Sequence, residues 1–433
     1  MQPTGTRDYL KGALWFYPTL AVVLALLVGA GLSAVPVSAM PWLEPALFQG
    51  TADDARNLLI GISGTMMTVI ALVLGLTLVA LQLSSTQYSP RLLRNFLRDR
   101  VNQLLLSVFV ATFVYATAGL YTVGVRSGHR VFDYPRLAVT FALVLLLASL
   151  IVLVYFVHHV SHSIQVDAVM VRVEQSTMHV IEHDLPTRGV IEGAPPEPPV
   201  WAVPVPAYRS GYVQTLHSAP LLQATAAHEV VLRLVPMVGE HVVEGAPLAW
   251  VWRTSPEQRP PDASALTGVV HDAVRLGYER TAEQDVALGV RQLTDIAVRA
   301  LSPAVNDPYT AIQALQHSSV LLAALAARPL GCIERFDDDG ALRVVLPGRD
   351  LAYYLDLAIG QVRRYGAAEP RVVNALLRVL HGTGRFCRGD AGRALVAAQV
   401  RLVREAAEHR IGQAADLRPV TEYADRVLRE VTG

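Results

Sequence analysis

The sequence is poor in lysine and cysteine and has no net charge, and each shortage narrows the possible functions. Lys11 is the only lysine, so no later region can be a carrier module that is modified on a lysine. Basic and acidic residues number 37 each, which gives no nucleic-acid signal for the chain as a whole. Cys332 and Cys387 stand at no metal-ligand spacing and are expected to be free thiols in a reducing compartment.

Catalytic motifs are also missing. The chain has no recognisable nucleophile–base pair, metal triad or phosphate-binding loop. We therefore expect no enzyme, no cofactor and no metal site.

What the chain does contain is four long apolar segments within its first 160 residues. They span residues 14–35, 58–83, 104–125 and 137–157. A bilayer core of about 30 Å needs about 20 apolar residues in a helix, and only a helix satisfies its own backbone in lipid. The sequence therefore predicts a transmembrane domain over residues 1–165 with four transmembrane helices.

Loop charges predict the orientation. Arg7 and Lys11 precede the first segment, and the loop after the second segment is rich in arginine. The positive-inside rule then places both termini in the cytoplasm of a bacterium, with the chain in its cytoplasmic (inner) membrane. An alternative is that the first segment is a signal peptide, since Val37, Ser38 and Ala39 resemble a cleavage site.

The second segment carries a face of small and polar residues. Five of them, at three-four or seven-residue spacing, are candidate path-lining positions: Gly61, Thr68, Gly75, Gln82 and Ser85. One interpretation is close helix packing, because small residues let helix backbones approach. The other is the wall of a hydrated path for ions or solutes.

A short amphipathic stretch follows the second segment. Arg91, Arg94 and Arg98 fall on one helical face, with apolar residues on the other. This pattern predicts an interfacial helix whose arginines bind anionic lipid headgroups. An ordinary charged loop would explain the arginines but not their spacing.

The fourth segment ends in a histidine pair. His158 and His162 are one helical turn apart, a spacing that suits a metal pair, but no further ligand follows on that face. Interfacial or pH-responsive histidines are the alternative.

The remaining residues predict a cytoplasmic α+β domain. A helical and Pro-rich linker over 166–206 precedes a β-rich, small barrel-like module over 207–255, which could be structural or ligand-sensing. A mainly helical region over 264–433 follows, with a hairpin near 332–346 whose turn contains Gly340.

The helical region contains a candidate polar network, formed by Asp285, Gln292, Asp295, Arg299, Asn306 and Asp307. Asp295 and Arg299 form an i,i+4 pair with the acid first, and Asp307 before a proline is a predicted helix cap. The face could be solvated, part of a buried structural network, or a catalytic site without a recognisable motif.

Several strings together resemble a bacterial family of predicted membrane proteins, the domain of unknown function 2254. They are residues 81–99, 155–161, 210–214, 279–285 and 299–308. Val305 and Tyr309 stand where the resemblance leads us to expect Ile-like and Phe-like residues. The resemblance implies an architecture but no activity, and it supplies no site residues.

Three functions remain open. The first is a homo-oligomeric channel or transporter-like protein with a cytoplasmic regulatory domain, because four helices are too few to enclose a wide path. The second is a membrane-anchored sensor or scaffold without conduction. The third, an integral-membrane enzyme, has the least support from the sequence.

Overall fold

The computed structural model describes residues 15–35, 41–87, 100–123, 134–163, 165–187, 190–191, 197–254, 261 and 263–433. The chain divides into two compact units, residues 1–165 and residues 166–433.

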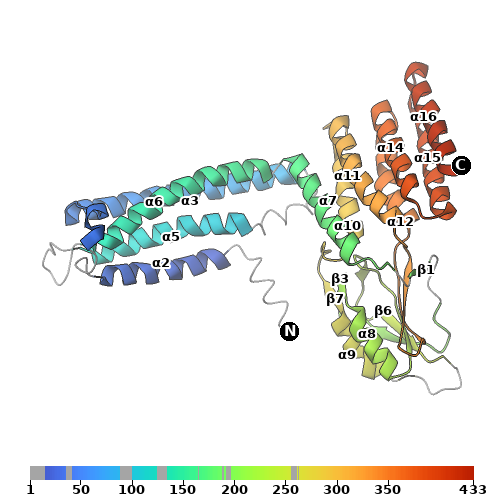
Figure 1. Ribbon diagram of the computed structural model, residues 1–433, viewed down its shortest axis with the longest axis horizontal. Coiled ribbons are helices and arrows are strands. Elements are labelled where there is room, and N and C mark those ends of the chain that lie inside the picture. Colours follow the sequence, from blue (N-terminus) through green and yellow to red (C-terminus); the bar gives the residue numbers. More distant parts are fainter. Residues whose placement is uncertain are drawn as a thin grey trace. The chain divides into compact units, whose positions relative to one another are not determined.

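The first unit is a bundle of long apolar helices (Figure 1). The elements described in it are α2 (Phe16–Ala34), the 3₁₀-helix η2 (Pro41–Ala46), α3 (Ala52–Gln87), α5 (Arg100–Thr122) and α6 (Arg136–Ser163). Four of them are long and apolar enough to cross a membrane. The helix α5 packs against each of the other three long helices, most extensively against α2 and α3.

Apolar side chains fill the interior of this unit. Leu59, Met66 and Val73 of α3 are buried together with Phe109 of α5 and Phe156 of α6. Only one face of α3 takes part, because its buried residues recur at three-four spacing along the helix. Its other faces point away from the core of this unit.

The second unit contains two sheets. The strands are β1 (Val190–Ile191), β2 (Val203–Pro206), β3 (Gly211–Leu216), β4 (Val231–Leu234), β5 (His241–Val242), β6 (Pro247–Trp252), β7 (Val274–Gly277), β8 (Cys332–Phe336) and β9 (Leu342–Leu346). Six strands form one sheet in the order β1-β8-β9-β4-β6-β2, and three form another in the order β5-β3-β7. The helices α8 (Ser218–Ala227) and α9 (Ala263–Ala273) pack on each other and on the larger sheet.

The expected barrel-like module is not confirmed, because the strands described here form two open sheets and no closed barrel. Residues 332–346 do form a hairpin, β8–β9, with Gly340 at a φ of +79° in its turn. Its strand β9 pairs in parallel with β4. The hairpin therefore extends the sheet that contains β4 and β6 instead of standing apart from it.

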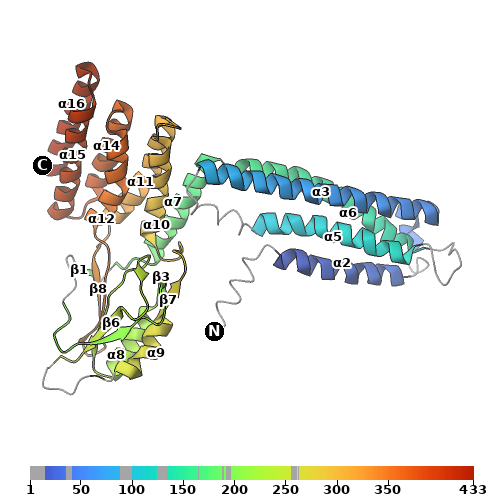
Figure 2. The ribbon, with the colours of Figure 1, turned by 180° about the vertical axis from the view of Figure 1, so that it is seen from behind.

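The rest of the second unit is an array of helices, which Figures 1 and 2 show side by side. They are α7 (Val166–His183), α10 (Val286–Ala300), α11 (Pro308–Ala326), α12 (Leu351–Leu355), the π-helical turn η3 (Asp356–Gly360), α13 (Gln361–Gly366), α14 (Pro370–Phe386), α15 (Asp390–Arg410) and α16 (Ala414–Thr432). Asp285, Asp307 and Asp350 cap α10, α11 and α12 by accepting a backbone N–H of the first turn.

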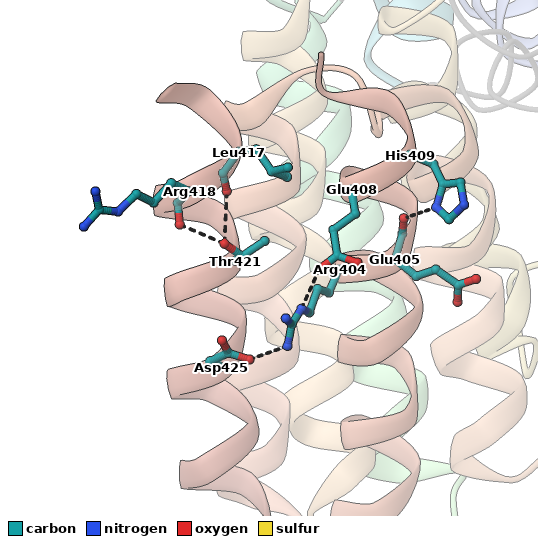
Figure 3. Close-up of polar contacts among 8 residues, drawn as sticks. All are labelled: Arg404, Glu405, Glu408, His409, Leu417, Arg418, Thr421 and Asp425. Atoms are coloured by element: carbon teal, nitrogen blue, oxygen red, sulfur yellow. Dashed lines mark hydrogen bonds and ion pairs between the residues drawn. The ribbon is translucent and has the colours of Figure 1, made fainter. Parts of the chain in front are cut away.

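The last two helices are joined by surface ion pairs (Figure 3). Arg404 of α15 binds Glu408 on its own helix and Asp425 on α16. These side chains are partly exposed, so pairs of this kind contribute little stability. Val396 and Val403 of α15 and Val420 and Val427 of α16 are buried, and burial of such apolar side chains contributes more stability than the exposed pairs.

Candidate functional site

The small and polar face predicted on α3 lies on the outside of its unit. Gly61, Thr68, Gly75 and Gln82 are exposed, whereas the buried residues of α3 lie on the opposite side. A Cβ added at Gly61, Gly64 or Gly75 would have no atom within 4 Å. Ser85 lies in α3, but its side chain is outside the described residues. The face is therefore not used for packing within the part of the chain that the structure describes.

The hydroxyl groups near this face are satisfied by their own helix. Thr68 donates to the carbonyl of Gly64 at 3.2 Å, and Ser63 donates to that of Ile60 at 2.9 Å. Such bonds let a hydroxyl face lipid or another helix without water.

The buried polar side chains described in the first unit lie mainly on α5, where no site was predicted from the sequence. They are Asn102, Gln103, Ser107 and Thr112 of α5 and Ser149 of α6. Thr112 and Ser149 are hydrogen-bonded to each other at 3.0 Å, and Ser107 donates to the carbonyl of Gln103 at 2.6 Å. The sequence signal that could have identified these buried residues is the presence of polar residues at the start of an otherwise apolar segment.

The histidines at the end of α6 have their rings in close, tilted contact. The rings of His158 and His162 lie 4.1 Å apart between centroids, and both side chains are exposed. Among the described residues no group of three His, Cys, Asp or Glu side chains could hold a metal ion. Arg91, Arg94 and Arg98 lie outside the described residues, so their predicted interfacial helix has no structural counterpart here.

In the second unit a buried ion pair joins Arg280 to Asp285. The Arg280 guanidinium donates to both carboxylate oxygens, through Nε at 2.7 Å and Nη2 at 2.9 Å. The same carboxylate accepts the backbone N–H of Leu288 at 3.0 Å and is completely buried. Burial acts to lower the pKa of Arg280, but the hydrogen bonds and charge of Asp285 outweigh it and raise that pKa.

Two glutamines form hydrogen bonds between the segment 279–285 and the smaller sheet. Gln284 accepts the backbone N–H of Leu216 at 2.8 Å. Gln214 donates to the carbonyl of Glu279 at 2.9 Å and accepts from Arg275 at 3.0 Å. The strings 210–214 and 279–285, distant in sequence, are thus brought together as a junction between β3 and the start of α10.

A glycine packs directly against the Arg280–Asp285 pair. Gly239 has a φ of +86°, and a Cβ there would overlap the Asp285 carboxylate and lie 2.9 Å from Nε of Arg280. No L side chain fits that position without displacing the ion pair. Tyr354 is buried nearby, and its burial raises its pKa. The contacts are close and mutually satisfied, which is typical of a structural joint.

The other members of the predicted polar network are spread along two helices. Gln292 is buried in α10, Asp295 and Arg299 are half-buried on it, and Asn306 is exposed with a φ of +48°. Asp307 caps α11 through the N–H and hydroxyl of Thr310, and these bonds lower the pKa of its carboxyl group. Asp285 and Asp307 stand at opposite ends of α10 and do not form one site.

Comparisons with known proteins agree with this architecture. The sequence model of a family described as predicted membrane protein, domain of unknown function 2254, matches residues 11–382. Uncharacterised proteins of Mycobacterium bovis and Mycobacterium tuberculosis H37Rv are each 41% identical to this chain over 427 residues. The alignments cover 98% of this chain and 82% of those proteins. No solved structure matches the chain.

Proposed function

The chain belongs to the family of predicted membrane proteins defined by the domain of unknown function 2254. From the exposed, glycine-rich face of α3 we propose that copies of the chain associate through this outer face. The assembly acts as a channel or transporter-like protein of the bacterial cytoplasmic membrane. The second unit serves as its cytoplasmic regulatory domain, and no enzymatic step is involved.

One observation carries the proposal. The glycine-rich face of α3 is exposed and has open space at Gly61, Gly64 and Gly75. A surface that meets only lipid gains nothing from glycine, whereas small residues let two helices approach closely. The occupant of this face in our proposal is the α3 helix of a second copy.

Conduction would use the same face. Packed apolar side chains fill the core of the single bundle, so a path between copies needs less rearrangement than one through each copy. Thr68 and Gln82 supply polar groups along α3, and an exposed amide such as Gln82 is costly in lipid unless it finds a polar partner.

Cysteine cross-linking tests the association. Gly75→Cys and Thr68→Cys are made in a chain in which Cys332→Ala and Cys387→Ala remove the native thiols. The matched controls are Leu74→Cys and Met67→Cys, because these neighbours are exposed at the same depth but about 100° around the helix. Disulfide-linked dimers are expected at Gly75 and Thr68. Equal or absent cross-linking at all four positions contradicts the association.

Flux and reactivity measurements test the conduction. Cysteines at Thr68, Gly75 and Gln82 should react with a water-soluble thiol reagent, and reconstituted protein should pass ions or small solutes. Gly75→Leu fills the face and should reduce that flux, whereas Leu74→Ala should not.

The second candidate is a membrane-anchored sensor or scaffold without conduction. The self-satisfied hydroxyls of Thr68 and Ser63 favour it, because such a face can pack dry. Cross-linking at Gly75 together with no reagent access and no flux would select the scaffold over the channel.

The proposed orientation and lipid contact have separate tests. With both termini in the cytoplasm, reporter fusions at Gly128 and after Gly433 should report opposite sides of the membrane. The arginines Arg91, Arg94 and Arg98 should each contribute about 1 kcal/mol to binding of anionic vesicles. Replacing the three by Gln should therefore weaken that binding, and unchanged binding would leave only the charged-loop interpretation.

A further inference from the structure

Two adjacent amide side chains at the start of α5 are buried without hydrogen bonds. Asn102 is 7% exposed and Gln103 is 0% exposed. Their four amide atoms (Oδ1 and Nδ2 of Asn102, Oε1 and Nε2 of Gln103) have no hydrogen-bond partner within the described part of the chain. Native interiors leave few such groups unpaired, because each costs about 1–3 kcal/mol.

The other buried polar side chains described in this unit are satisfied. Ser107 donates to the Gln103 carbonyl, and Thr112 and Ser149 bond to each other. Among the described residues of this unit, the buried polar side-chain atoms without a hydrogen-bond partner are therefore confined to the first turn of α5, which begins at Arg100. We call this the Arg100 end of the bundle.

Contacts of α5 with the neighbouring helices define the depth of the two amides in the bundle. Thr112 on α5 is level with Ser149 on α6, and a Cβ on Gly29 of α2 would lie 3.4 Å from the ring of Tyr115 on α5. Because α2 and α5 run in the same direction, Asn102 is level with Phe16, the first residue of α2, within about one turn. The amides therefore lie at the edge of the apolar span.

We infer that the Arg100 end of each bundle holds bound water molecules, hydrogen-bonded to Asn102 and Gln103. Each primary amide offers two donors and one acceptor group. A cation would satisfy only the two oxygens and an anion only the two nitrogens. Water both donates and accepts, and the solvated interface is within about one helical turn.

This site is distinct from the proposed contact between copies. The amides are covered within a single chain, whereas the α3 face is exposed. The inference therefore stands or fails independently of association and conduction.

Thiol reactivity provides the first test. Gln103→Cys and Phe109→Cys are made in the full-length chain lacking Cys332 and Cys387, and treated with a small cationic methanethiosulfonate. Both positions are 0% exposed, but Phe109 lies in the apolar core. Water beside residue 103 ionises the thiol more readily, and one unit of thiol pKa corresponds to about tenfold in thiolate. We expect Gln103→Cys to react about tenfold faster or more; equal rates overturn the inference.

Thermal stability provides the second test and does not depend on reagent size. Gln103→Met keeps the approximate shape of the side chain and removes the amide. If the amide is dry and unpaired, its removal raises the Tm; if it is hydrated, its removal leaves water without partners and lowers the Tm. Leu104→Met, at an exposed neighbour, is the control for the introduced methionine. We expect a lower Tm for Gln103→Met relative to this control, and an equal or higher Tm overturns the inference even if the thiol reacts.

Discussion

The polar and small residues of α3 and those of α10 lie in opposite environments: mostly exposed on α3 and mostly buried on α10. In α10 the capping carboxylate of Asp285 is buried and fully bonded, and Gly289 lies tightly against Thr177 of α7. In α3 the small residues Gly61, Gly64 and Gly75 face outward with nothing near them. Both helices carry ordered small or polar positions in sequence, but within the described residues only those of α10 contact other elements.

An ordered sequence pattern can arise from contacts within the fold or from a contact outside the single chain, and the two helices differ in this respect. The pattern at α10 is explained by the fold, because the Arg280–Asp285 pair, Gln214 and Gln284 all close one junction. The pattern on α3 is left unexplained by the contacts described within one chain. The functional proposal therefore rests on the first unit, and substitutions in the two helices should have different consequences.

The largest effect is expected from Arg280→Ala. Removal of the guanidinium leaves the buried Asp285 carboxylate without its counter-ion, which should destabilise the chain by about 3–5 kcal/mol. Chemical unfolding of the detergent-solubilised protein, followed by circular dichroism, measures the change.

The matched control is Arg418→Ala. Arg418 pairs with Glu422 on α16, and both side chains are exposed. Its loss should cost at most about 1 kcal/mol. Similar losses in the two variants would show that the junction is not a buried electrostatic contact. Arg299→Ala should fall between them, because Asp295 and Arg299 are half-buried.

The second effect concerns Gly289→Ala. A new Cβ would overlap Oγ1 of Thr177 and lie 2.8 Å from its Cβ and Cγ2, so α7 and α10 must separate. Overpacking of this kind costs typically about 1–3 kcal/mol. The double variant Gly289→Ala with Thr177→Ala should recover part of the loss in unfolding experiments. No recovery would place the strain elsewhere.

Much of the fold follows from the sequence, but the ends of the helices do not. Apolar runs of about 20 residues have essentially one solution in lipid, so the four long helices were predictable. The helix α3 nevertheless begins at Ala52, six residues before the predicted start, because Thr51 and Asp54 cap it through their side chains. Hydropathy detects the apolar run and not the polar turn that extends it.

Because hydropathy does not detect such polar turns, the buried amides of α5 were not predicted. The predicted segment began at residue 104, whereas α5 begins at Arg100 and takes Asn102 and Gln103 into the bundle. The direction of the α3 face was also beyond the sequence, since periodicity identifies a face but not the neighbour it meets. The open sheet depended on β9, more than 100 residues after β4, and such distant pairing leaves no local signal.

A smaller, pH-dependent effect is expected at Asp307. Its hydrogen bonds to Thr310 lower the pKa of the carboxyl group in the folded chain below its ordinary value of 3.8. The stabilisation is therefore present above the unfolded pKa and is lost as the pH falls through the folded pKa. At neutral pH Asp307→Ala should cost about 1 kcal/mol as a lost helix cap.

Stability measured from pH 7 to pH 3 checks the sign. The difference between the natural chain and Asp307→Asn, which keeps a capping oxygen but cannot ionise, should shrink toward the acid end. A difference that grows on acidification would contradict the lowered pKa.

The smallest effect on folding is expected at Gly75, and it gives the sharpest contrast with Gly289. A larger side chain at Gly75 meets no atom of the described residues within 4 Å at the Cβ position, so Gly75→Leu should change the stability of the single chain by no more than about 0.5 kcal/mol. If copies meet at this face, the same leucine separates their helices and weakens association.

Unfolding and light-scattering measurements on one detergent-solubilised sample report the two effects separately, with Leu74→Ala as the control at the same depth. An unchanged Tm with loss of the oligomer fits an interface between copies. An unchanged Tm and an unchanged oligomeric state would make the α3 face a lipid-exposed surface, and the contrast with α10 would then carry no functional meaning.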